Sequence, residues 1–177
     1  MFGHFSETMG RSWRDCRMQA SSVTRPRLLD VMPLLPALGE KYPAGCSWLE
    51  RRLDDVSAGR AFLSVAHFGG VVAALAIETP KGLHVRKLST FVVSPDWRHQ
   101  GLGTALLGNL RRSWLAREVD SAYVTIDYSD TITQEFFQKN GFFPDPNILI
   151  PYGRGRFDRL FRWAAPSDTL ANSSAVH

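Results

Sequence analysis

Apolar runs in the middle of the chain predict three neighbouring β-strands. Residues 61–67 and 71–78 are rich in apolar and β-branched side chains, and the tripeptide Phe68-Gly69-Gly70 separates them. This pattern is typical of a β-hairpin. A second turn at residues 80–82 leads into a third run over residues 83–93. We therefore expect an antiparallel meander that ends at Val93.

The apolar period changes after this meander. Large apolar residues recur every four positions at Leu102, Leu106, Leu110 and Trp114. This spacing predicts an amphipathic helix with one buried face. Residues 119–128 then alternate between apolar and polar side chains, which predicts a further strand with one buried face.

A shorter helix and two strands are expected in the C-terminal part of the chain. Thr131 and Gln134 have the spacing of a capping box at a helix N-terminus, and Gly141 stands where such a helix would end. Residues 147–151 and 157–163 have the composition of strands. The small, polar residues 165–177 predict a disordered tail.

The N-terminal part predicts a flexible arm followed by a strand and two helices. Residues 1–21 show no helical or strand period, so we expect an arm, and either Met1 or Met18 is the natural start. A strand is expected over residues 23–29, a short helix after Asp30 and another helix over 47–57. The folded domain is expected to span residues 22–164.

Composition indicates one ordinary globular domain and excludes several classes of protein. Of the 177 residues, 44% are hydrophobic and 21% are charged, which argues against disorder. The net charge of 21 − 17 = +4 mildly favours anionic partners. Cys16 and Cys46 lie far apart without CxxC spacing, so neither a disulfide framework nor a zinc site is expected. Without an apolar run of signal-peptide or membrane-span length, we expect a cytoplasmic protein with no membrane partner.

An anion-binding turn is expected between the third strand and the first long helix. The seven residues of this turn are Arg98, His99, Gln100, Gly101, Leu102, Gly103 and Thr104. The glycines allow a tight turn, and the first amides of the helix lack intrahelical acceptors and carry the positive end of the helix dipole. The turn therefore suits a pyrophosphate, and a side chain at Gly103 is expected to fill the space that the pyrophosphate needs.

Two segments resemble those of a known family. Residues 93–107, VSPDWRHQGLGTALL, closely resemble the acetyl-CoA signature of the GNAT (GCN5-related N-acetyltransferase) acyltransferases. Residues 135–142, EFFQKNGF, look like the FYEKxGF segment of the same family. The resemblance covers about residues 22–163. It implies an α+β fold with a mixed, mostly antiparallel sheet of six to seven strands and about four helices, splayed at the acetyl-CoA site.

The resemblance also implies roles for individual residues. Phe91, Val92 and Val93 match the strand that pairs with the pantetheine arm of acetyl-CoA, and residues 98–104 match the pyrophosphate loop. Phe137 stands where the family usually has a tyrosine that protonates the leaving thiolate, and a phenyl ring cannot donate that proton. The implied reaction is acetyl transfer from acetyl-CoA to a primary amine by direct attack in a ternary complex, performed by a monomer or a homodimer.

The general base and acid stay open at this level. Candidates for the base, chosen as polar groups at or near strand ends, are Glu78, His84, Asp127 and Asp130, and Tyr128 is the nearest alternative acid. Structural roles are equally possible: Glu78 as a solvated strand end, His84 as a surface residue and Asp130 as a helix cap. His99 is expected to bind phosphate through its backbone amide.

Two other functions are compatible with the sequence. Four arginines, Arg154, Arg156, Arg159 and Arg162, alternate with aromatic residues near the C-terminus. They suit an acceptor amine on RNA or charged tRNA, although the aromatic residues also suit a buried strand. The absence of a tyrosine at Phe137 allows a non-catalytic acyl-CoA-binding module.

Overall fold

The computed structural model describes residues 21–22, 31–34, 36–38, 45–68, 70–151 and 156–166. Its elements, in chain order, are β1 (Ser21–Ser22), η2 (Met32–Leu34), α3 (Gly45–Ser57), β2 (Phe62–Phe68), β3 (Val71–Pro80), β4 (Val85–Val93), η3 (Pro95–Trp97), α4 (Leu102–Ala116), β5 (Ser121–Asp127), α5 (Thr131–Lys139), β6 (Phe143–Pro151) and β7 (Phe157–Ala164). This order confirms the predicted alternation of strands and helices.

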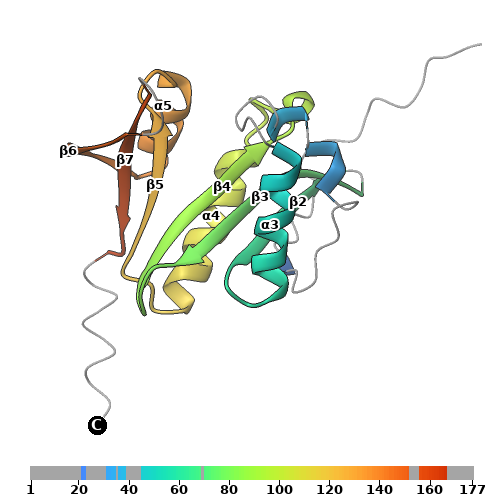
Figure 1. Cartoon of the computed structure of the whole chain (residues 1–177), viewed down its shortest axis with the longest axis horizontal. Helices are drawn as coiled ribbons and strands as arrows, with labels where there is room; N and C mark the ends of the chain where they lie inside the picture. Colours follow the sequence, from blue (N-terminus) through green and yellow to red (C-terminus); the bar gives the residue numbers. More distant parts are fainter. Residues whose placement is uncertain are drawn as a thin grey trace, which may run out of the picture.

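The strands form one open sheet in the order β1-β2-β3-β4-β5-β7-β6 (Figure 1). Every neighbouring pair is antiparallel except β4 and β5, which run parallel. The predicted mostly antiparallel sheet of six to seven strands is therefore confirmed. The meander of β2, β3 and β4 forms because short turns join consecutive strands, whereas α4 makes the crossover from β4 to β5.

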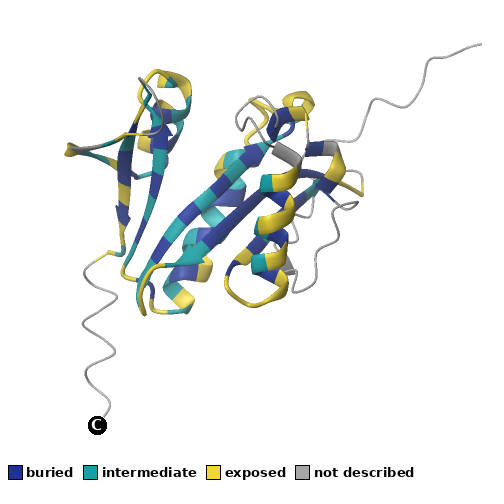
Figure 2. Ribbon diagram, viewed as in Figure 1, coloured by how far each residue is buried: buried dark blue, intermediate teal, exposed yellow. Residues whose placement is uncertain are grey.

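Helices α3 and α4 pack on opposite faces of the meander (Figure 1). Because successive side chains of a strand point to opposite faces, Ala74 and Ala76 of β3 join the core under α4, while Leu75 and Ile77 join the core under α3. Figure 2 shows the resulting burial along the central strands and the exposed outer side of α3. Two apolar cores thus hold β3 and β4 rigidly at the centre.

The sheet splays between its two halves. Strands β4 and β5 pair only from Val85 with Ser121 to Lys87 with Tyr123. Beyond these pairs β4 continues to Val93 and β5 continues to Asp127, and Figure 1 shows them diverging. A bulge in the β3–β4 ladder accompanies the divergence, because Ile77 pairs with Thr90 and Glu78 with Leu88. The edge of β4 that faces β5 therefore lacks a strand partner there.

Several predicted features fall outside the described residues. The expected strand over residues 23–29, the expected cap Asp30 and the tail beyond residue 166 all lie outside the described residues. The expected arm over residues 1–21 also lies outside them, except for Ser21, which pairs with Val65. Strand β6 begins at Phe143, four residues earlier than expected. In the part of the chain that the structure describes, none of the helices combines the length and the apolar character needed to cross a bilayer.

Candidate functional site

A cavity of about 540 Å³ lies at the divergence of β4 and β5. Side chains from α3, the end of β3, the second half of β4, the end of β5, α5 and the start of β7 line it. Such a volume suits a small-molecule ligand. Because Trp48, Arg51 and Arg52 of α3 contribute to its wall, the cavity opens on the sheet face that α3 covers.

Aromatic rings close the inner end of this cavity. Phe91 of β4 and Phe137 of α5 both line it, with ring centroids 5.6 Å apart. Phe137 is 1% exposed, and its ring also packs edge to face on Phe142 at 5.1 Å. Of the predicted pantetheine strand, Val92 packs in the core under α3, and Val93 packs against the core under α4. The inner end of the cavity is therefore apolar, and Phe137 offers it no proton donor.

Asp158 of β7 is a buried carboxylate in the cavity that the sequence reasoning missed. It is 5% exposed and pairs in register with Asp127 of β5. Burial raises the pKa of Asp158, the Arg156 guanidinium opposes this rise, and the Asp127 charge adds to it. The only sequence signal was a single carboxylate in the last predicted strand, residues 157–163, which also contains Arg159 and Arg162.

Asp127 lies in the same cavity but in a more polar environment. Its carboxylate accepts hydrogen bonds from the Ser129 hydroxyl at 2.7 Å and the Ser129 amide at 2.8 Å. It also pairs with Arg156 at 2.8 Å. The bonds from Ser129 lower the pKa of Asp127, and the positive charge of Arg156 acts in the same direction. Asp127 therefore stays ionised and binds protons more weakly than Asp158.

Asp130 also lines the cavity, where it caps α5. Its carboxylate accepts from the Thr133 amide at 3.0 Å and the Thr133 hydroxyl at 2.7 Å. The predicted capping box on Thr131 was wrong by one residue, because Asp130 is the cap and Thr131 begins the helix. Gln134 instead donates its side-chain amide to the carbonyl oxygens of residues 127 and 128, both at 2.9 Å.

The structure does not bring the other three acid–base candidates to this cavity. Tyr128 is 52% exposed, with the Arg159 guanidinium 4.8 Å from its ring centroid. His84 lies before β4, at the end of the sheet where β4 and β5 are paired, with its Nδ1 2.6 Å from the Glu118 carbonyl oxygen. Both residues lie outside the cavity wall.

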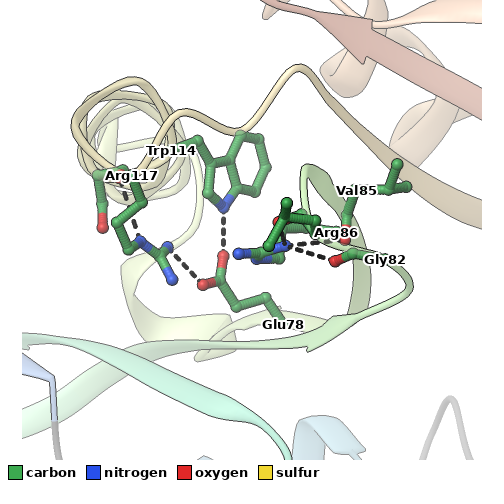
Figure 3. Close-up of polar contacts among 8 residues, drawn as sticks. Glu78, Gly82, Val85, Arg86, Trp114 and Arg117 are labelled. Atoms are coloured by element: carbon green, nitrogen blue, oxygen red, sulfur yellow. Dashed lines mark hydrogen bonds and ion pairs between the residues drawn. The ribbon is translucent and has the colours of Figure 1, made fainter.

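Glu78 points to the opposite face of the sheet, under α4. Figure 3 shows its carboxylate between the Trp114 indole, whose Nε1 donates to one oxygen, and Arg117, whose Nη2 lies 2.5 Å from the other oxygen. Glu78 is 1% exposed and Trp114 is fully buried. Since a buried carboxylate needs compensating donors, these contacts give Glu78 a structural role.

Several buried polar atoms at the cavity have no hydrogen-bond partner among the residues that the structure describes. They include Arg52 Nε, Thr90 Oγ1 and Asp158 Oδ1, and all three residues line the cavity. Asp158 Oδ1 lies 3.7 Å from Arg156 Nε in an ion-pair contact, and a hydrogen bond with the Thr125 side chain opposes the rise in the pKa of this carboxylate. Buried polar groups are normally bonded, so unsatisfied ones need an explanation such as a ligand. Two donors and one acceptor are therefore available to a molecule in the cavity.

The predicted anion-binding turn stands at the N-terminus of α4, apart from the cavity wall. Gly101 is the N-cap residue with φ 81°, and the Ala105 amide donates to its carbonyl oxygen at 3.0 Å. His99 has φ 59°, Arg98 donates through Nε to the Val93 carbonyl at 3.3 Å, and Gln100 Nε2 donates to the residue 96 carbonyl at 3.2 Å. These contacts hold the turn in shape, with Thr104 exposed on the first turn of the helix.

Gly103 lies where α4 packs closely on α5 and β4. A Cβ atom at this position would meet two ring carbons of Phe136 at 3.2 Å and the Val93 side chain at 3.5 Å. A side chain at Gly103 would therefore crowd Phe136 of α5 and Val93 of β4. The Leu102 side chain is buried in the same region.

The C-terminal arginines have partners within the described residues. Arg156 binds Asp127, Arg159 stacks on Tyr128, and Arg162 pairs with Asp145 at 3.2 Å. Arg154 lies outside the described residues. These contacts do not favour a continuous basic strip for RNA. The described residues also contain no cluster of three or more metal-ligating side chains.

Comparisons with known proteins agree with this geometry. Residues 58–144 match the family model described as an acetyltransferase (GNAT) domain. No similar sequence was found among curated proteins.

Solved structures with the same fold cover most of the chain. A GNAT-family protein from Desulfovibrio desulfuricans superposes with a TM-score of 0.70 at 17% identity, over 81% of this chain and 96% of that one. An aminoglycoside 6′-N-acetyltransferase complexed with coenzyme A gives 0.67 at 17% identity, over 84% and 98%. The ribosomal-protein-S18-alanine N-acetyltransferase of Escherichia coli gives 0.66 at 21% identity, over 85% and 97%.

Proposed function

Because the chain belongs to the GNAT family of acetyltransferases, we propose that it transfers an acetyl group from acetyl-CoA to a primary amine by direct attack in a ternary complex. The observation that carries this proposal is the cavity at the splay. It combines an apolar inner end at Phe91 and Phe137 with a buried carboxylate, Asp158, and a buried hydroxyl, Thr90. Acyl transfer to an amine needs a proton acceptor and a donor to the carbonyl oxygen in one site.

Acetyl-CoA fits the two features on the donor side. The amides of the first turn of α4, behind the Gly101 cap, suit a pyrophosphate. The edge of β4 over residues 88–93 has no strand partner on the β5 side, so its backbone groups are free to pair with the amide groups of a pantetheine arm. When bound, acetyl-CoA supplies the thioester to be attacked.

Asp158 is our candidate for the proton acceptor. Burial raises its pKa, whereas Asp127 has a lowered pKa and is already bonded to Ser129 and Arg156. A carboxylate with the higher pKa is the better base toward an ammonium group. The ammonium group loses one proton to Asp158, and the neutral nitrogen bonds to the acyl carbon. As the C–S bond breaks, the electron pair leaves on sulfur, and the nitrogen releases its second proton to solvent to give the amide.

The remaining groups assist this reaction in simpler ways. The Thr90 hydroxyl is 2% exposed and has no hydrogen-bond partner within the described ranges, so it can donate to the carbonyl oxygen as negative charge develops there. No tyrosine stands at Phe137, so the thiolate leaves without a proton from that side chain. An ordinary thiol has a pKa of about 8.5, which makes this departure feasible near neutral pH.

The test compares Asp158→Asn and Thr90→Val with the wild type. The protein is incubated with acetyl-CoA and a panel of amines, and free thiol is measured. We expect Asp158→Asn to lower kcat by about 10²- to 10⁴-fold while the affinity for CoA stays unchanged. Thr90→Val should lower kcat by about 10-fold or more.

Asp145→Asn is the matched control, because Asp145 of β6 pairs with Arg162 of β7 and does not line the cavity. Its kcat should stay close to that of the wild type. An unchanged kcat in Asp158→Asn would remove Asp158 as the base. CoA binding without turnover of any amine would favour the non-catalytic alternative.

A further inference from the structure

The cavity carries a group of positive charges on its α3 side. Arg51 and Arg52 come from α3, Lys81 from the turn after β3, and Lys87 from the part of β4 that precedes the bulge. Strand pairing places Lys87 opposite Thr79, which also lines the cavity. Four cations from three segments therefore face one small volume.

These cations are poorly compensated by the protein. Within the described part of the chain, the structure records no ion pair for Lys81 or Lys87. Arg52 reaches Asp55 through Nη2 at 2.8 Å, but its buried Nε has no hydrogen-bond partner. The pKa of Lys87 is lowered, chiefly by burial and then by the charges of Lys81 and Arg52, while Asp158 acts in the opposite direction. The protein therefore keeps a partly desolvated positive charge that an anion would stabilise.

The carboxylates of the cavity come from the end of β5, the residue before α5 and the start of β7, and they are mostly occupied. Asp127 is bonded to Ser129 and Arg156, and Asp130 is bonded to Thr133. Asp158 keeps one oxygen without a hydrogen bond. The cavity thus combines the cations of α3, the turn after β3 and β4 with a carboxylate at β7 that lies close enough to Lys87 for each charge to shift the pKa of the other. A ligand that matches both kinds of charge carries an ammonium group and an anionic group in one small molecule.

We propose that the acceptor is a primary amine that also bears an anionic group, either a carboxylate or a phosphate. Its amine lies at Asp158 and its anionic group at Lys81, Lys87 and Arg52. This inference rests on the proposed function and names the substrate class of the same site. The positive group is not needed for the pyrophosphate of acetyl-CoA, because the turn at Gly101 belongs to α4, on the opposite face of the sheet from α3, and does not line the cavity.

The experiment measures acetyl transfer to matched pairs of acceptors. Each amino acid of a panel is compared with the amine that remains when its carboxylate is removed, and aminoalkylphosphonates form a third arm. We expect the acidic member of at least one pair to have a kcat/KM about 10-fold or more higher, since charge-assisted hydrogen bonds to arginine and lysine are strong. A preference for the phosphonate over the carboxylate would assign the anion as phosphate. If the amines without an anionic group react as well as their acidic partners in every pair, the inference is wrong.

Two variants locate the effect. Lys87→Met keeps the length of the side chain and removes its charge, so KM for the acidic amine should rise about 10-fold while KM for its neutral partner stays the same. Lys87→Arg should keep the preference. Lys139→Met is the control, because Lys139 is an exposed lysine on α5 that pairs with Glu135. A rise in KM for acetyl-CoA instead of the acceptor would overturn the inference and assign the cations to the donor.

A binding measurement separates this inference from the proposed function. Isothermal titration of the same acceptor pairs into the protein, with CoA present, does not require turnover. If no amine is acetylated, the proposed function fails, but tighter binding of the acidic member that is lost in Lys87→Met still supports the inference. Equal binding of both members would overturn it whether or not turnover occurs.

Discussion

Replacing Glu78 tests whether this carboxylate supports the fold or the chemistry. Glu78 is 1% exposed and bonds Trp114 and Arg117 under α4 (Figure 3). Glu78→Ala leaves the buried indole N–H without an acceptor, which costs about 1–3 kcal/mol. The Arg117 side chain is 33% exposed, so losing that ion pair adds about 1 kcal/mol at most.

The expected loss of unfolding free energy in Glu78→Ala is therefore about 1–4 kcal/mol. For a chain of this length that corresponds to a fall in Tm of roughly 2–16 °C. Glu78→Gln keeps an oxygen for the indole and loses the charge opposite Arg117, so it should cost about 1 kcal/mol or less. In both variants kcat should stay within about threefold of the wild type at a temperature where the protein is folded.

Circular dichroism during thermal and urea unfolding measures the stability, and thiol release from acetyl-CoA measures kcat. Asp145→Asn again serves as the control for a carboxylate elsewhere in the sheet. A Glu78→Gln protein with wild-type stability and a kcat lowered by about 100-fold would refute the structural role and restore Glu78 as a base candidate.

Further predictions concern the packing of α4 on α5 and the dependence of stability on pH. Gly103→Val should lower the free energy of unfolding by about 1–3 kcal/mol, because its side chain overpacks against Phe136. Gly103→Ala should be nearly neutral, because the higher helix propensity of alanine offsets the close contact. Unfolding curves and CoA titrations check both variants, and wild-type stability of Gly103→Val would contradict the packing argument. Because burial raises the pKa of Asp158, its contribution to stability falls as pH rises from the ordinary aspartate range through the folded pKa. As pH rises over this interval, the free energy of unfolding of Asp158→Asn should therefore increase relative to that of the wild type, as measured by urea unfolding at several pH values. A relative increase as pH falls would contradict the prediction. The lowered pKa of Asp127 acts oppositely, with stability lost as pH falls through it, and Ser129→Ala should raise that pKa in an NMR titration.

Most of the fold followed from local patterns. The three-residue turns between apolar runs predicted the meander, and a four-residue apolar repeat predicted the buried face of α4, whose Leu106, Leu110 and Trp114 are all buried. Alternation in β5 predicted its inner residues correctly. Such signals are strong because neighbouring residues in one element impose the period themselves. The capping box at Thr131 failed because two adjacent residues, Asp130 and Thr131, both have capping side chains.

The site was only partly predictable. The turn before α4, which is predicted to bind an anion, lies in one continuous stretch, so the place of Gly101 at the helix N-terminus could be predicted from the order of residues along the chain. The cavity instead joins α3, β4, β5 and β7, and no local pattern reports that Asp158 lies near Lys87. The identity of the unsatisfied atoms depends on burial and on partners far away in the sequence.

The sequence alone thus determined the order of the elements, the position of the glycine turn before α4 and the resemblance to an acetyltransferase family, because each depends on residues close together in the chain. Tertiary structure decided which carboxylates are free to act. Glu78 and Thr79 are adjacent in β3 and point to opposite faces of the sheet, so Glu78 lies under α4 and Thr79 lines the cavity. Strand pairing places Asp158 beside Asp127. Their chemistry differs because burial and bonding partners, which arise only on folding, change the stability of each charge.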